Sequence, residues 1–244
     1  MKRILLAAFI ITLVGCAKNA PVAKQVGTIQ RDTILGVPCC VYLPGHYDER
    51  SEEIFPVLYL QHGMWGNEND WPEKGNLIGI MDSLLRTDKV KEMVIIMPDN
   101  CPSYPSYEEE KAHATDGHWE ADFAHFMTEA ESTYRISSDS SQRAIAGLSM
   151  GGYHTMMVSS VLDGQFAYVG MFSAATFVHH APSEPAMLWT AIGKDDFLYD
   201  SFQQYRHWLE QSHREYTYYE STGGHDWPNW QDYLSRFLSI CFYR

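Results

Sequence analysis

The stretch Gly147-Leu148-Ser149-Met150-Gly151-Gly152 has the pattern G-x-S-x-G and directly follows a short strand-like segment, residues 143–146. A serine in this pattern lies on a tight turn between a strand and a helix, where flanking glycines let the backbone turn without a clash. The turn exposes the hydroxyl at a helix N-terminus, whose dipole and free N–H groups favour a developing anion. A glycine-rich turn with a chance serine fits the same five residues, so the rest of the chain must supply the context.

Strand-like and helix-like stretches alternate on both sides of this turn, without repeats, low-complexity blocks or an internal linker. Residues 56–61 and 93–97 are continuous apolar runs, as expected for parallel strands covered on both faces. Further elements are a hairpin at 28–43 that turns near Leu35-Gly36, strands at 143–146, 167–173, 186–192 and 216–220, and helices at 76–85, 119–134, 153–162, 201–212 and 230–242. We therefore predict one α/β domain over residues 28–244, with a mostly parallel sheet and helices on both faces.

Composition places the chain among ordinary globular proteins. It has 244 residues, of which 45% are hydrophobic and 20% charged, which is enough to bury a full core. The formal net charge is −13. An acidic surface argues against nucleic acid and anionic membrane surfaces as partners, and it leaves neutral substrates such as esters or polysaccharides open.

The N-terminus has the features of an export signal. Met1-Lys2-Arg3 is basic, residues 4–14 form an apolar run too short to span a bilayer, and Leu13-Val14-Gly15-Cys16 is similar to a bacterial lipobox. We predict a signal peptide at 1–15, lipidation at Cys16, a tether at 16–27, and a lipid-anchored position in the bacterial cell envelope, periplasmic or at the cell surface. The alternative is a plain secretory signal with a stray cysteine.

Four further cysteines, Cys39, Cys40, Cys101 and Cys241, leave their pairing open. An oxidising compartment permits disulfides, and buried free thiols are equally compatible with the sequence. Adjacent Cys39 and Cys40 would point to opposite faces of a strand. The spacing of the four does not match a zinc site.

A serine nucleophile needs a base, and the base needs an orienting carboxylate. In the order serine, acid, histidine, Gly193-Lys194-Asp195-Asp196-Phe197 follows one predicted strand and Gly223-Gly224-His225-Asp226-Trp227 follows the last. We predict Ser149 as nucleophile, His225 as general base and then acid, and Asp196 as its orienting group. Asp195 is the alternative acid, and Asp226 is expected to stabilise its loop.

The oxyanion that forms during attack needs two N–H donors. Met150 follows the nucleophile and is the first predicted donor. The second is assigned to Met64, in the loop Gln61-His62-Gly63-Met64-Trp65-Gly66 after an earlier strand. His62 is expected to order this loop rather than to act as a base.

Four separated motifs, in the same order and at similar spacing, resemble the esterase D / carbohydrate esterase family 1 group, over roughly residues 28–243. They are Val57-Leu58-Tyr59-Leu60-Gln61-His62-Gly63-Met64, Ala144-Ile145-Ala146-Gly147-Leu148-Ser149-Met150-Gly151-Gly152-Tyr153, Gly193-Lys194-Asp195-Asp196-Phe197-Leu198-Tyr199 and Gly223-Gly224-His225-Asp226-Trp227. That group includes tributyrin, feruloyl and acetylxylan esterases and S-formylglutathione hydrolases. The resemblance implies a three-layer α/β-hydrolase fold and hydrolysis of carboxylic esters through an acyl-enzyme. It also implies a triad of Ser149, Asp196 and His225 with oxyanion donors at Met64 and Met150.

Three tryptophans are candidate substrate-binding residues. Trp65 stands where many relatives of that group have a small residue, and could narrow the acyl site. Trp227 and Trp230 flank the histidine loop, where aromatic rings stack on sugars or aromatic acyl groups. Ordinary packing of the last helix is the alternative for this pair. Residues 101–117 are predicted to form a long loop of the kind that builds substrate walls.

No cofactor or metal is expected, since the remaining histidines are scattered and H-E-x-x-H is absent. The expected partner is an ester substrate, including acylated oligo- or polysaccharides. Three alternatives to hydrolysis of such esters stay open: an S-formylglutathione hydrolase-like thioesterase, an acyltransferase, and a non-catalytic carbohydrate-binding lipoprotein on the same fold.

Overall fold

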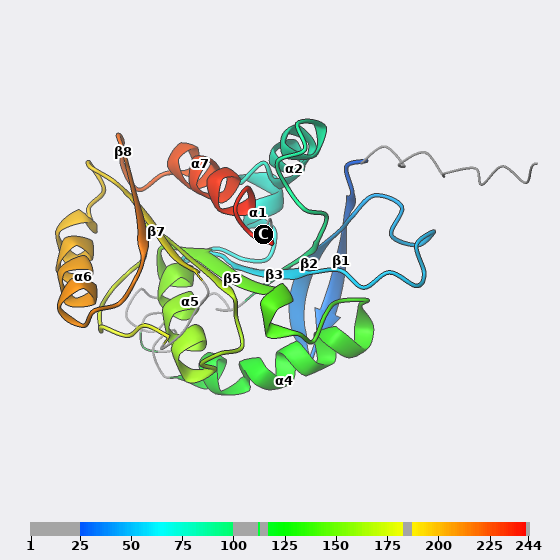
Figure 1. Cartoon of the computed structure of the whole chain (residues 1–244), viewed down its shortest axis with the longest axis horizontal. Coiled ribbons are helices and arrows are strands. Elements are labelled where there is room, and N and C mark those ends of the chain that lie inside the picture. The colour runs from blue at the N-terminus through cyan, green and yellow to red at the C-terminus, as the bar shows by residue number, and fades with distance from the viewer. Residues whose placement is uncertain (1–24, 100–111, 113–116, 183–186, 243–244) are drawn as a thin grey trace, which may run out of the picture.

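The computed structural model describes residues 25–99, 112, 117–182 and 187–242, and its strands form one eight-stranded sheet (Figure 1). Along the sheet the order is β1-β2-β4-β3-β5-β6-β7-β8. β1 and β2 are antiparallel, β2 is antiparallel to β4, and the pairs from β4 to β8 are parallel. The strands are β1 Thr28–Ile34, β2 Val37–Leu43, β3 Val57–Gln61, β4 Val94–Pro98, β5 Arg143–Leu148, β6 Tyr168–Phe172, β7 Met187–Gly193 and β8 Thr217–Ser221.

Helices cover both faces of the sheet and bury a separate core on each side. α4 (His118–Thr133), α5 (Met150–Val161) and α6 (Tyr199–Gln211) pack on one face, and α1 (Asp70–Glu73), α2 (Leu77–Arg86) and α7 (Trp227–Leu238) on the other (Figure 1). A short 3₁₀ helix, η1 (Ser140–Gln142), leads into β5. This is the three-layer, mostly parallel α/β architecture that was predicted.

Most helices and strands lie where the sequence predicted them, and the bounds that differ from the prediction do so for physical reasons. The β1–β2 turn lies at Leu35 and Gly36, whose φ angles of 50° and 80° suit a two-residue hairpin turn. α5 begins at Met150, three residues before the predicted start, because the turn at Ser149 leads straight into it. α7 begins at Trp227 rather than Trp230, since the Asp226 side chain caps it by accepting from the Asn229 N–H at 3.1 Å. α1 was not predicted.

Cys39 and Cys40 point to opposite faces, as predicted, and each lies in a different core cluster. Cys39, Cys40 and Cys241 are buried free thiols in the part of the chain that the structure describes. Burial raises the pKa of Cys39 to about 12. Cys101 lies outside the described residues.

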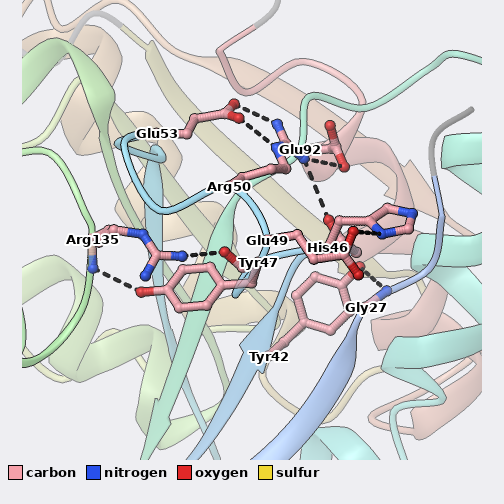
Figure 2. Close-up of polar contacts among 10 residues, drawn as sticks. Gly27, Tyr42, His46, Tyr47, Glu49, Arg50, Glu53, Glu92 and Arg135 are labelled. Atoms are coloured by element: carbon pink, nitrogen blue, oxygen red, sulfur yellow. Dashed lines mark hydrogen bonds and ion pairs between the residues drawn. The ribbon is translucent and has the colours of Figure 1, made fainter. Parts of the chain in front are cut away.

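The first described residues join the sheet at the edge where the parallel strands begin. Thr28 pairs with Leu43, and Tyr42 pairs with Ile95 at the start of β4. The Gly27 N–H donates to the Tyr42 hydroxyl at 3.0 Å (Figure 2). The carboxyl ends of the parallel strands, where open α/β sheets bind ligands, form the opposite edge.

Charged contacts hold the neighbouring loop, residues 44–55, at this same edge (Figure 2). Arg50 pairs with Glu53, and its Nη1 lies 3.0 Å from Glu92 Oε1. The backbone N–H of Arg135 donates to the Tyr47 hydroxyl at 2.8 Å. These contacts therefore hold the 44–55 loop against the sheet edge at which β1 begins.

Several predicted features lie outside the described residues. They are the signal peptide at 1–15, the lipidation at Cys16, most of the tether at 16–27 and nearly all of the loop at 101–117. Within the described residues, no helix combines the length and apolarity that a membrane crossing requires.

Candidate active site

A cleft of about 390 Å³ opens at the carboxyl edge of the parallel strands. Its size lies within the range of small-molecule sites. Most of the predicted site residues line it, from loops that are far apart in the sequence: Met64, Trp65, Ser149, Met150, His225, Trp227 and Trp230. Asp196 is buried next to the cleft, behind His225.

Ser149 occupies the strained turn between β5 and α5. Its φ and ψ are 53° and −116°, a left-handed conformation that non-glycine residues rarely adopt. The flanking glycines permit the close packing: a Cβ on Gly147 would come 2.4 Å from the Gly151 carbonyl oxygen, and one on Gly151 would come 2.3 Å from that of His62. This geometry matches a nucleophile elbow, with the serine at the N-terminus of α5.

Asp196, and not Asp195, is paired with His225. The Nδ1–H of His225 faces both carboxylate oxygens of Asp196, at 3.0 and 2.9 Å. The Asp196 side chain is fully buried, whereas Asp195 is exposed. Asp196 also accepts from the Leu198 N–H at 2.9 Å, so its carboxylate is fixed from two sides. A buried carboxylate on Nδ1 holds the imidazole with Nε2 available as a base.

Backbone hydrogen bonds tie the aspartate loop to the histidine loop. The Asp195 N–H donates to the Gly223 carbonyl at 2.9 Å, and the Lys194 N–H to that of Ser221 at 3.0 Å. Buried Asn229 completes the link by donating to the Gly224 carbonyl at 2.8 Å. The relative position of the two catalytic candidates therefore depends on the sheet edge rather than on their side chains alone.

The Tyr233 hydroxyl, on α7, shares a 2.5 Å hydrogen bond with the hydroxyl of Ser221, the last residue of β8 before the histidine loop. Burial raises the pKa of Tyr233; the bond to Ser221 acts in the opposite direction, and the nearby charge of Asp196 raises it again. The phenol stays neutral and serves as a support for the strand end.

The predicted oxyanion donors lie on two loops that border the cleft. Met150 is the first residue of α5, and Met64 follows Gly63 after β3. Among the described residues, neither backbone N–H donates to a carbonyl. Both are therefore available to an oxygen bound above Ser149.

His62 is buried beneath the Met64 loop and contacts two neighbouring segments. Its Nδ1 lies 2.7 Å from the Gly63 carbonyl oxygen, and its Nε2 lies 3.3 Å from Asp99 Oδ1, just after β4. The Gly63 carbonyl also accepts from the Gly66 N–H at 3.1 Å. These contacts fit the predicted role of His62 in ordering the loop.

The three predicted tryptophans lie at the cleft in different ways. Trp65 is 63% exposed and has a φ of 58°. Trp230 is buried, and its ring packs against the His225 imidazole with centroids 4.9 Å apart. Trp227 is half-buried and packs against Trp71 and Trp230, with one side on the cleft. Trp230 thus supports the site, while Trp65 and Trp227 can reach a ligand.

Sequence reasoning missed other lining residues. Phe177, after β6, and Phe197, directly after Asp196, are exposed aromatic residues on the cleft. Lys74 and Asp70 also line it, with Lys74 Nζ 2.9 Å from Asp70 Oδ1. For Phe197, its position beside the predicted acid Asp196 was a sequence feature that could have placed it at the site. Asp70 had no such feature, because α1, which carries it, was not predicted.

The described residues hold no group of three or more His, Cys, Asp or Glu side chains that could bind a metal ion. What the cleft offers is a strained serine, a histidine held by a buried carboxylate, and two free amides. This set of groups can transfer an acyl group through a covalent serine intermediate.

Comparisons with known proteins agree with the motif-based resemblance. The model of the family described as "Putative esterase" matches residues 36–216. An endo-1,4-beta-xylanase/feruloyl esterase of Xylanibacter ruminicola is 29% identical over 160 residues, which cover 64% of this chain and 22% of that protein. An acetyl esterase of Caldicellulosiruptor saccharolyticus is 22% identical over 236 residues, which cover 76% of this chain and 82% of the relative.

Among solved structures, a CE1 ferulic acid esterase from Anaeromyces mucronatus, in complex with ferulic acid, superposes with a TM-score of 0.80 at 22% identity. The match covers 89% of this chain and 92% of that one. At this identity the likeness shows a shared fold. The chain spans about a fifth of the length of the Xylanibacter relative, so it corresponds to one part of that larger protein.

Proposed function

This chain belongs to the family described as "Putative esterase", and from that premise we propose that it is a serine carboxylesterase. The observation that carries the proposal is the bond between His225 and the buried Asp196, beside the cleft that also holds Ser149. A serine, an imidazole and an orienting carboxylate are the groups that activate a hydroxyl for attack on an acyl carbon.

The steps follow from the roles of these residues. The Ser149 hydroxyl attacks the ester carbonyl carbon and its proton passes to Nε2 of His225, while Asp196 holds the Nδ1–H. The N–H groups of Met64 and Met150 stabilise the oxyanion. His225 then gives the proton to the leaving alcohol, which leaves an acyl group on Ser149. Water, activated by the same imidazole, releases the acid.

We propose esters of carbohydrates as the substrate class, with acetyl, feruloyl or other short acyl groups. The aromatic lining of the cleft, which includes Trp65 and Trp227, supports binding of flat rings. The relatives are named as feruloyl and acetyl esterases. The net charge of −13 fits a neutral substrate such as an acylated oligo- or polysaccharide.

The test is an assay of the protein and its Ser149→Ala variant on p-nitrophenyl acetate, longer p-nitrophenyl esters, acetylated xylan and feruloyl sugars. Turnover that depends on Ser149 is expected, and the preferred ester names the acyl group. Equal turnover by the variant would defeat the serine mechanism. Product analysis with an added alcohol, and an assay with S-formylglutathione, would reveal a transferase or a thioesterase instead.

We further propose that the protein is lipid-anchored in the cell envelope through Cys16. The basic, apolar and lipobox-like segments of residues 1–16 support this. The position of Gly27, just before β1, is compatible with it, because this residue lies beside the sheet edge opposite the cleft. Fatty-acid labelling that is lost in a Cys16→Ala variant is the expected result; labelling that persists contradicts the anchor.

A further inference from the structure

Phe197 is the most exposed of the large apolar side chains among the described residues, at 76%. Single exposed apolar residues are common and carry no message. Phe197, however, borders the cleft together with exposed Trp65 and Phe177. Exposed apolar side chains that gather around a cleft indicate a ligand-contact surface.

Backbone hydrogen bonds hold Phe197 at the rim of the cleft. The Asp196 N–H donates to the Gly193 carbonyl at 3.2 Å, and the Tyr199 N–H to that of Asp196 at 2.9 Å. The Asp196 carboxylate accepts from the Leu198 N–H at 2.9 Å. The carboxylate that holds His225 therefore also fixes the turn that presents Phe197.

The ring of Phe197 packs directly on the His225 imidazole. The two centroids are 4.5 Å apart, with the planes tilted by 54°. The other aromatic neighbour of the imidazole, Trp230, is buried. Both residues line the cleft, and Phe197 is by far the more exposed of these two aromatic contacts of His225.

The chemistry of the proposed reaction decides which half of an ester meets this ring. His225 must donate a proton to the alcohol oxygen as the bond between acyl carbon and oxygen breaks, so that oxygen lies within hydrogen-bond reach of the imidazole. The acyl half stays on Ser149. A side chain that touches the imidazole at the mouth of the cleft therefore borders the alcohol half.

We propose, on the basis of the proposed esterase function, that Phe197 is a stacking surface for a sugar ring in the alcohol half of the substrate. The face of an aromatic ring carries partial negative charge, which attracts the C–H groups on the apolar face of a sugar. An alcohol as small as methanol cannot cover that face. Phe197 then selects esters by their alcohol, independently of their acyl group.

The experiment compares two esters of one acid, one with methanol and one with a pentose, for both ferulic and acetic acid. The readout is the ratio of kcat/KM for the pentose ester to kcat/KM for the methyl ester. In the full chain, Phe197→Leu keeps an apolar cover over His225 and removes the aromatic face; we expect the ratio to fall roughly three- to tenfold. Phe197→Trp should preserve the ratio. Phe177→Leu removes another aromatic ring at the rim, one that packs on Tyr153 with centroids 5.9 Å apart, and should preserve it too.

Equal losses on methyl and pentose esters in Phe197→Leu would overturn the proposal, because they would mean that Phe197 only packs on the imidazole. A ratio that falls as far in Phe177→Leu would overturn it as well. Failure of the esterase function looks different: the unmutated protein would hydrolyse none of the four esters.

Discussion

The turn at Ser149 predicts that the nucleophile is held at a cost in stability. Its φ of 53° and ψ of −116° suit glycine, and a non-glycine residue held there costs about 1–3 kcal/mol. Two variants separate this strain from the chemistry, since Ser149→Ala and Ser149→Gly both lack the hydroxyl and differ only in the Cβ. The serine side chain makes no capping hydrogen bond to α5, so neither variant loses a cap.

The expected difference follows from two opposing terms. Glycine relieves the strain but gains about 0.4–1 kcal/mol of unfolded-state entropy relative to alanine. Ser149→Gly should therefore be more stable than Ser149→Ala by about 1 kcal/mol, which for a chain of this length is about 2–4 °C in Tm. Guanidinium unfolding and calorimetry of the two inactive variants measure it.

A control pair at exposed Ser83, inside α2, should show the opposite sign, because glycine costs about 1 kcal/mol against alanine in a helix. If Ser149→Gly is no more stable than Ser149→Ala while the Ser83 pair behaves as expected, the turn is unstrained and the reasoning fails.

Three other outcomes are expected. Asp196→Ala should lower kcat by roughly 10³- to 10⁴-fold, as loss of the orienting carboxylate does elsewhere, while Asp195→Ala should change it little; the reverse order would assign the acid wrongly. Hydrogen bonds from Tyr199 and Tyr218 and the ion pair with Lys194 lower the pKa of Glu220 from 4.5. The stability that the ionised Glu220 contributes is therefore present above about pH 4.5 and is lost as the pH falls further. A Glu220→Gln variant should lose less stability than the unmutated protein in acid unfolding curves, and parallel curves would contradict this. In a variant with Cys16 and Cys101 replaced by serine, the buried thiols of Cys39, Cys40 and Cys241 should resist a disulfide reagent at about pH 8 and react in denaturant. Rapid labelling of the folded protein would contradict their burial.

The sheet and the catalytic candidates were predictable because each rests on a local physical requirement. Continuous apolar runs signalled buried parallel strands, and the glycines around Ser149 signalled a turn where a Cβ would collide with a neighbouring backbone. Position after a strand marked Asp196 as the acid but left its neighbour Asp195 as an alternative, and the structure separates them: the Asp196 side chain is buried against His225 and Asp195 is exposed. Each of these signals is contained within a few residues.

The rim of the cleft was not predictable in the same way. Phe177 and Phe197 belong to loops that follow different strands, and only the tertiary structure brings them to one mouth. The sequence also could not separate Trp230, which is buried against His225, from Trp227, which is more exposed on the cleft. Both are tryptophans three residues apart near the start of α7, and burial alone assigns their roles.

Strain at this edge of the sheet extends beyond the nucleophile. Trp65, after β3, and Ser173, after β6, also have positive φ angles, of 58° and 45°, so three adjacent strands end in loops with non-glycine residues in a conformation that favours glycine. Strain of this kind persists where the side chain is needed and the surrounding structure enforces it. Trp65 therefore combines a backbone conformation that favours glycine with an exposed ring on the cleft.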